Sequence, residues 1–129
     1  MGSQVQQVKI LIVEDDLVAS KVAQMVLEEK GYRVDCVFSG QAAIQRLKEN
    51  YDLVILDLGL PDMHGFEVAK KIRESNGPLA SVQIIVLTAF DVEQSQKTDN
   101  KLDIKNYFSK PFTLEKCEQM LELAKFTCH

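Results

Sequence analysis

Short apolar runs alternate with helical apolar stripes along this chain. Five runs predict β-strands, at residues 8–13, 32–38, 53–56, 82–87 and 104–108. The run at 53–56 is wholly apolar, which is typical of a central parallel strand that is buried on both faces. Between the strands, the spacing predicts helices at residues 16–30, 41–49, 66–74 and 91–101, and a last helix that starts at Thr113.

Two of the predicted helices carry details that bear on the fold. In the first helix, Val18, Val22, Met25 and Val26 share one stripe, the pattern of an amphipathic helix. Gly65 precedes the third predicted helix, and we expect it to enter that helix at a φ that other residues avoid.

The sum is five strand–helix repeats, which predict a parallel sheet with helices on both faces because each crossover is right-handed. In such sheets the functional crevice lies at the carboxyl ends of the strands. The residues that follow the strands are therefore the first candidates for chemistry.

Charged and polar residues follow four of the five predicted strands. Glu14 and Asp15 follow the first strand, Asp57 follows the third, Thr88 follows the fourth and Lys110 follows the fifth. Crowded carboxylates repel one another, and a hard divalent cation with oxygen ligands, such as Mg²⁺, relieves this repulsion. An aspartate beside such a cation, a lysine and a hydroxyl donor is suited to accept a phosphoryl group.

Four motifs in order carry a family resemblance. They are VEDD at residues 13–16, LDLGLPDMHG at 56–65, LTA at 87–89 and KPF at 110–112. With them the chain resembles the receiver domain of two-component response regulators over residues 8–126. The resemblance implies an α/β, doubly wound, flavodoxin-like fold, with a five-stranded parallel sheet of order 2-1-3-4-5 flanked by five helices. Residues 1–7 are expected to be disordered or to be a remnant of cloning, and residues 127–129 are expected to form a C-terminal tail.

The resemblance also assigns a role to each residue around the metal. Asp57 would be the phosphoacceptor and a ligand of Mg²⁺, for which Mn²⁺ could substitute. Asp15 and the backbone carbonyl of Gly59 would be further direct ligands, and Glu14 would bind through water.

The phosphoryl oxygens and the switch would involve residues of the last two strands. Thr88 and Lys110 would each contact a phosphoryl oxygen, and the rotamer of Tyr107 would follow Thr88 on activation. Pro111 would follow a cis peptide bond. Phosphorylation would then repack the face made by helix 4, strand 5 and helix 5.

Two residues near the acceptor, Gly59 and Phe90, have no polar side chain. By the same resemblance, Gly59 and Phe90 border the path of the hydrolytic water. We expect Phe90 to shield the phosphorylated aspartate and to make that state long-lived.

Composition limits which partners and which cellular environment we expect for the chain. The net charge of −4 argues against nucleic-acid binding by this domain. The longest apolar stretches are too short to span a bilayer, so the sequence predicts a cytoplasmic protein without a membrane segment. Cys36, Cys117 and Cys128 show no metal-binding spacing.

Several alternatives stay open at this point. The expected donor is the phosphohistidine of a histidine kinase or a histidine phosphotransfer domain, and the effector is unknown. The chain would be a signalling domain that promotes its own phosphorylation and dephosphorylation, not an enzyme with external turnover. It could be a single-domain regulator, part of a longer regulator or the receiver of a hybrid histidine kinase. It could also form a homodimer through helix 4, strand 5 and helix 5. The rival interpretations are a non-phosphorylated receiver-like interaction module and a nucleotide-binding or hydrolytic α/β enzyme, such as a phosphatase of the haloacid-dehalogenase type.

Overall fold

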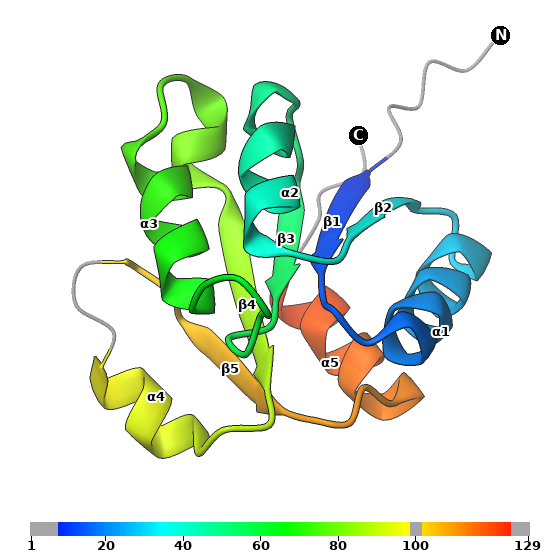
Figure 1. Ribbon diagram of the computed structural model, residues 1–129. Helices are drawn as coiled ribbons and strands as arrows, with labels where there is room; N and C mark the ends of the chain where they lie inside the picture. Colours follow the sequence, from blue (N-terminus) through cyan, green and yellow to red (C-terminus); the bar gives the residue numbers. More distant parts are fainter. Residues whose placement is uncertain (1–7, 99–101, 125–129) are drawn as a thin grey trace, which may run out of the picture.

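The computed structural model describes residues 8–98 and 102–124, and its centre is a parallel β-sheet (Figure 1). The sheet has five strands in the order β2-β1-β3-β4-β5, which confirms the predicted order. The strands are β1 (Lys9–Val13), β2 (Arg33–Val37), β3 (Leu53–Leu56), β4 (Gln83–Thr88) and β5 (Asn106–Ser109).

The helices lie in two layers, one on each face of the sheet. They are α1 (Leu17–Glu29), α2 (Gly40–Gln45), α3 (Gly65–Glu74), α4 (Val92–Thr98) and α5 (Leu114–Ala124), with 3₁₀ turns η1 (Arg46–Lys48) and η2 (Pro78–Ser81). Figure 1 shows α1 and α5 together on one face and α2 with α3 on the other. The predicted disordered residues 1–7, the predicted tail 127–129 and the end of the helix predicted at 91–101 lie outside the described residues.

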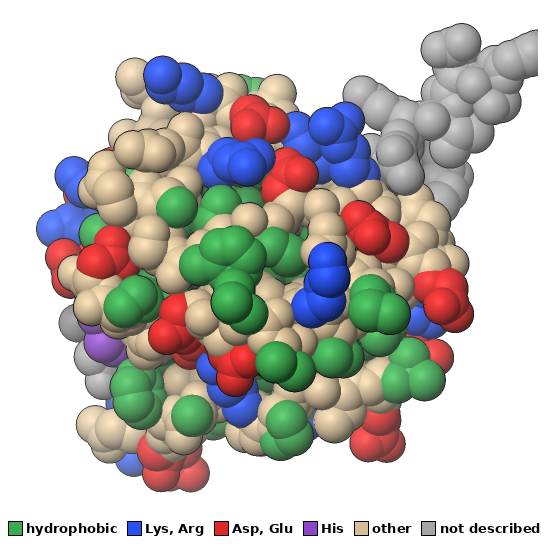
Figure 2. Space-filling model, turned by 45° about the vertical axis from the view of Figure 1, so that its right-hand side comes forward, with side chains coloured by type: hydrophobic (Ala, Val, Ile, Leu, Met, Phe, Trp, Pro, Cys, Tyr) green, Lys and Arg blue, Asp and Glu red, His purple; other side chains and the backbone are tan. Residues whose placement is uncertain are grey.

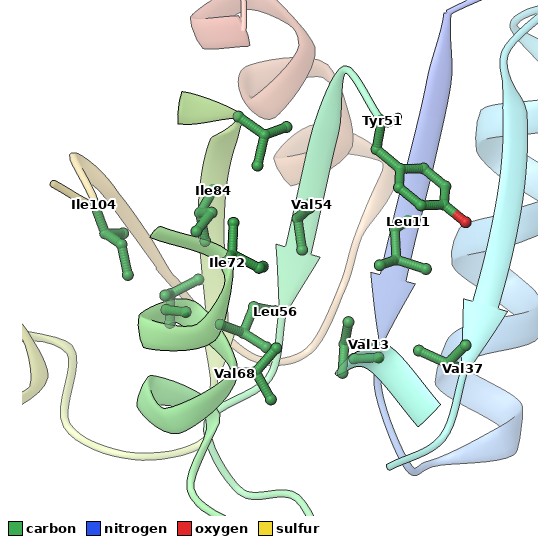
Figure 3. Close-up of a cluster of buried hydrophobic side chains, with 14 of the residues drawn as sticks. Leu11, Val13, Val37, Tyr51, Val54, Leu56, Val68, Ile72, Ile84 and Ile104 are labelled. Carbon is green, nitrogen blue, oxygen red and sulfur yellow. The ribbon is translucent and has the colours of Figure 1, made fainter. Parts of the chain in front are cut away.

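Side chains alternate between the two faces of the sheet, as the pleat of a strand requires. In β3, Val54 and Leu56 point to the α3 side, where Ile72 packs against them (Figure 3). Leu53 and Ile55 point to the α1 and α5 side, where the buried side chains of the two helices meet them. Both faces of β3 are therefore buried, as its wholly apolar sequence predicts.

Three of the four stripe residues of α1 are exposed and only Val26 packs against the core, which corrects the expectation of an ordinary amphipathic helix. Val18 and Met25 are 73% and 62% exposed. The buried residues of α1 are instead Ser20, Ala23 and Leu27. The inner face of α1 thus combines two small side chains with Leu27, whereas Leu17, Val18, Val22 and Met25 are exposed.

The ends of α1 follow the sequence closely. The Oδ1 atom of Asp16 accepts hydrogen bonds from the backbone N–H groups of Val18 and Ala19, at 2.9 and 3.1 Å. Asp16 is thus the N-cap that its side chain favours. At the other end Gly31 has a φ of 96°, the left-handed conformation in which glycine commonly ends a helix.

Gly65 is required for space and not for its φ, so that expectation was wrong. Among the described glycines, only Gly31 and Gly77 have positive φ. A Cβ atom at position 65 would lie 2.5 Å from the carbonyl oxygen of Asp57 and 2.7 Å from Cα of Leu58. The start of α3 therefore packs directly on the backbone that carries Asp57.

Strand β5 begins two residues later than the sequence predicts. Ile104 is buried, but pairing with β4 starts at Asn106. The carbonyl oxygens of Leu102 and Asp103 accept hydrogen bonds from the guanidinium of Arg73, at 2.7 and 3.3 Å. The backbone before β5 thus binds a side chain of α3 instead of the neighbouring strand.

Within the described ranges, no helix combines the length and the apolar composition that crossing a bilayer would require. The cytoplasmic location stays a prediction.

Candidate functional site

Three carboxylates gather at the carboxyl edge of the sheet. Glu14 and Asp15 follow β1, and Asp57 follows β3, its neighbour in the sheet. One ligand atom from each lies within 4.8 Å of the others. Glu14 and Asp57 are almost fully buried, at 4% and 5% exposure, whereas Asp15 is exposed. The site therefore has two buried acids and one that reaches solvent.

Lys110 joins the two buried carboxylates. Its Nζ atom lies 2.9 Å from Oδ2 of Asp57 and 2.7 Å from Oε1 of Glu14. Its backbone N–H donates to the carbonyl oxygen of Thr88 at 2.9 Å, which ties the end of β5 to the end of β4. The peptide bond between Lys110 and Pro111 is cis, as predicted. One ammonium thus neutralises part of a crowded acidic site.

Burial and pairing act against each other in this cluster. Burial raises the pKa of Glu14 above its ordinary value, although the hydrogen bonds from Lys110 and from the backbone of Asp16 act in the opposite direction. Burial would lower the pKa of Lys110, but its hydrogen bonds to Glu14 and Asp57 outweigh that effect and raise the pKa. Lys110 is therefore held as a cation beside Glu14, whose burial makes its carboxylate costly to charge.

The remaining predicted site residues are Thr88, Gly59 and Tyr107. Thr88 is fully buried, and its Oγ1 atom accepts a hydrogen bond from the backbone N–H of Phe90 at 3.0 Å. The backbone N–H of Gly59 donates to Oδ1 of Asp57 at 3.1 Å. Tyr107 is half-buried in β5 and packs against the core on the α3 side. The structure thus brings Thr88 and Gly59 to the site and places Tyr107 further along the sheet.

Phe90 lies close to the loop that follows Asp57. A Cβ atom built on Gly59 would lie 3.4 Å from Cζ of Phe90 and 3.9 Å from Oδ1 of Asp57, so both side chains lie next to Gly59, and Phe90 itself is 52% exposed. The ring also stacks on His64, with 6.3 Å between the centroids and 18° between the planes. The place of Phe90 on the path of the hydrolytic water and its effect on the lifetime of a phosphorylated state both stay predictions.

A cavity of about 270 Å³ lies between α1 and the loop after β5. Its walls are largely apolar, with Val18 and Val22 from α1 and Phe112 from the loop. Asp57 and Lys110 lie at the same cavity. The exposed apolar side of α1 therefore adjoins the acceptor site.

Sequence reasoning missed Asp62, which braces the loop after β3. Its two carboxylate oxygens accept hydrogen bonds from the backbone N–H groups of Gly40 and Gln41, at 2.8 and 2.9 Å. These two bonds hold the pKa of Asp62 below its ordinary value. The partners lie more than twenty residues away at the start of α2, so no local pattern could have indicated the contact.

The model of the family described as the response regulator receiver domain matches residues 10–122. The chain belongs to this family. This receiver domain is 35% identical over 117 residues to the transcriptional regulatory protein CrdR of Helicobacter pylori, covering 90% of this chain and 54% of that protein. It is also 33% identical over 136 residues to histidine kinase 2 of Arabidopsis thaliana, covering 89% of this chain and 12% of that protein. The receiver domain thus spans about half of the first relative and a small part of the second.

Solved structures agree with the fold of the receiver domain. The response regulator TrrA of Thermotoga maritima, solved in complex with Mg(2+)-BeF, superimposes with a TM-score of 0.75 at 29% identity and covers 92% of this chain and 99% of its own. The chemotaxis response regulator CheY4 of Vibrio cholerae reaches a TM-score of 0.83 at 23% identity, covering 92% and 99% of the two chains, and this likeness shows the fold alone.

Proposed function

We propose that Asp57 of this receiver domain accepts a phosphoryl group from a phosphohistidine partner. The observation that carries the proposal is the buried Asp57 carboxylate, 2.9 Å from the Lys110 ammonium and grouped with two further acids. A carboxylate oxygen of Asp57 attacks phosphorus, and a P–O bond forms as the P–N bond to the imidazole breaks. The electron pair of the broken bond leaves with the imidazole nitrogen.

The donor set suits a hard divalent cation, since three carboxylate oxygens lie within 4.8 Å of one another. Asp15, Asp57 and the carbonyl oxygen of Gly59 would hold Mg²⁺, with Mn²⁺ as a substitute. When bound, the ion supplies positive charge next to the phosphoryl oxygens. The contacts of Glu14 support a role for it through water, because Oε1 already pairs with Lys110 at 2.7 Å and Oε2 accepts from the backbone N–H of Asp16 at 3.0 Å.

Lys110 and Thr88 are proposed to hold the transferred group. The Lys110 ammonium already lies beside Asp57 and can pair with a phosphoryl oxygen there. The Thr88 hydroxyl accepts from the backbone of Phe90, and a hydroxyl can donate its own proton to a phosphoryl oxygen at the same time. We infer that Tyr107 follows the new position of Thr88, so that the face of α4, β5 and α5 repacks and becomes available to an effector or a second copy.

The donor is proposed to dock on α1. Leu17, Val18 and Met25 each expose more than half of their surface, and Val18 also lines the cavity that contains Asp57. Figure 2, which turns the side with α1 forward, shows hydrophobic side chains at the surface between charged ones. Large exposed apolar side chains grouped on one helix mark interaction sites. A histidine kinase or phosphotransfer domain with an apolar helical surface would place its histidine at Asp57.

Direct phosphorylation tests the proposal. Phosphoramidate, a small donor with a P–N bond, should add one phosphoryl group to the wild-type chain in the presence of Mg²⁺, as detected by intact-protein mass spectrometry. Asp57→Asn should abolish the addition, and Asp91→Asn, an exposed acid in the loop before α4, should leave it unchanged. A wild-type chain that gains no mass and shows no Mg²⁺ binding by calorimetry would instead support a module that acts by contact alone.

The proposed domain of residues 8–126 is a signalling unit within a longer protein. The curated relatives reported above are longer than this chain, so a full regulator or a hybrid kinase is the proposed context. A lack of turnover on small phosphate esters would separate the phosphoacceptor from a phosphatase.

A further inference from the structure

Lys116 occupies an unusual place for a cation. It lies in the first turn of α5, where the positive end of the helix dipole disfavours a basic side chain. Its Nζ atom donates to the carbonyl oxygen of Ser109 and, at 3.1 Å, to that of Pro111. The backbone N–H of Lys116 is itself capped by Oγ1 of Thr113 at 3.1 Å. The ammonium is therefore committed to the loop that precedes its own helix.

The two carbonyls that Lys116 binds flank Lys110 directly. On the other side, the backbone N–H of Lys110 donates to the carbonyl oxygen of Thr88 at 2.9 Å. The backbone around Lys110 is thus held from β4 on one side and from α5 on the other. Residues 110–113 lie between the end of β5 and the start of α5, and backbone hydrogen bonds to those elements hold only the two ends of the segment, at the N–H of Lys110 and at the carbonyl oxygen of Thr113.

We propose that Lys116 is a positioning residue that fixes the backbone of Ser109 and Pro111 and thereby aims the Lys110 ammonium at Asp57. The inference rests on the proposed function, because it assigns Lys110 to the phosphoryl group. The contact acts on the position of Lys110 and not on the carboxylates that would bind the cation. Without the contacts of Lys116, the end of β5 is held only through β4, and the Lys110 ammonium samples more positions.

The test compares Lys116→Met, which keeps the long apolar stem without donors, with Lys116→Arg, which keeps donors. Lys70→Met, a change at an exposed lysine on α3, is the matched control. With saturating Mg²⁺, Lys116→Met should be phosphorylated by phosphoramidate about tenfold more slowly than wild type, since small misplacements of a reacting group are costly. Its Mg²⁺ affinity should not weaken, Lys116→Arg should recover most of the rate, and Lys70→Met should match wild type.

A second measurement does not depend on phosphoryl transfer. Acetic anhydride labelling, followed by peptide mass spectrometry, reports how accessible the Lys110 ammonium is, and Lys110 should react faster in Lys116→Met than in wild type. An unchanged labelling rate of Lys110 would overturn the positioning role, whether or not the wild-type chain accepts a phosphoryl group. A wild-type chain that accepts no phosphoryl group would count against the proposed function, and that outcome is separate from the labelling result. A slower phosphorylation that Arg does not rescue, with weaker Mg²⁺ binding in parallel, would also overturn it.

Discussion

Helices α1 and α3 cover opposite faces of one sheet, and they use their apolar side chains in opposite ways. In α3, Val68 and Ile72 are completely buried. In α1, Val18 and Met25 are mostly exposed, and the inner face is built from smaller residues such as Ala23. Val68 and Ile72 of α3 therefore serve the core, whereas Val18 and Met25 of α1 remain at the surface, with Val18 at the cavity that contains Asp57.

The difference teaches that an apolar stripe has two possible uses in this fold. A stripe that faces the sheet contributes stability, and its loss should appear in the free energy of unfolding. A stripe that faces solvent contributes little to stability, and its loss should appear in the transfer from a protein donor. Substitutions on the two helices can separate these uses.

The largest effect on stability is expected from Ile72→Ala in α3. The side chain is fully buried against β3, so its removal should lower the free energy of unfolding by about 2–5 kcal/mol through lost burial and the cavity left behind. Urea denaturation followed by circular dichroism measures the loss. A change below about 1 kcal/mol would show that α3 does not carry this face of the core.

Gly65→Ala should come next, because its Cβ atom would collide with the Asp57 carbonyl oxygen at 2.5 Å. We expect a loss of about 1–3 kcal/mol from overpacking. Gly77→Ala is the informative contrast, since nothing lies within 4 Å of that position and only its φ of 93° opposes a side chain. If Gly65→Ala were as stable as wild type in urea, the close packing of α3 on β3 would be contradicted.

Tyr51→Phe should have a smaller, pH-dependent effect on the α3 side of the sheet. The Tyr51 hydroxyl donates to Oδ2 of Asp35 at 2.8 Å, and its loss should cost about 1 kcal/mol at neutral pH. Burial and this hydrogen bond raise the pKa of Tyr51 to about 12 from an ordinary value of 10.0.

Because the folded state holds that proton more tightly, its stabilising contribution is complete below pH 10 and is lost as the pH rises towards 12. The difference in urea midpoint between wild type and Tyr51→Phe should therefore shrink over this range. A difference that stays constant to pH 12 would contradict the assignment.

The smallest effect on stability is expected on α1. Val18→Ser and Met25→Ser should change the free energy of unfolding by no more than about 0.5 kcal/mol, because both side chains are exposed. The same variants should accept phosphoryl groups from a phosphorylated histidine kinase core about tenfold more slowly, since a contact worth about 1.4 kcal/mol would be lost. Their reaction with phosphoramidate should not change. Equal transfer from the kinase core would remove α1 from the docking surface.

The sequence predicts the sheet and the site well for a common physical reason. Parallel strands bring their carboxyl ends to one edge, so Asp15, Asp57 and Lys110 could be placed together once their strands were recognised. The solvent-facing side of α1 could not be predicted, because a helical period shows that apolar residues share a face without showing where that face points.

The contacts of Asp62 and Lys116 were also beyond the reach of sequence reasoning. Both side chains bind backbone groups whose positions are set by loops and not by a repeating pattern. The role of Gly65 was misjudged for a related reason, since the backbone it touches belongs to the preceding strand end.

The ion pairs of Lys110 have a consequence for the choice of donor. Three carboxylates and one ammonium leave a formal charge of −2 at the edge of the sheet, on a chain that already carries −4 overall. Before a divalent cation binds, free anions that approach this edge are repelled, and the repulsion is stronger at low ionic strength. A donor protein that brings its own basic side chains would screen that charge on arrival. Without a bound divalent cation, we therefore expect the site to react poorly with small anionic donors such as phosphoramidate.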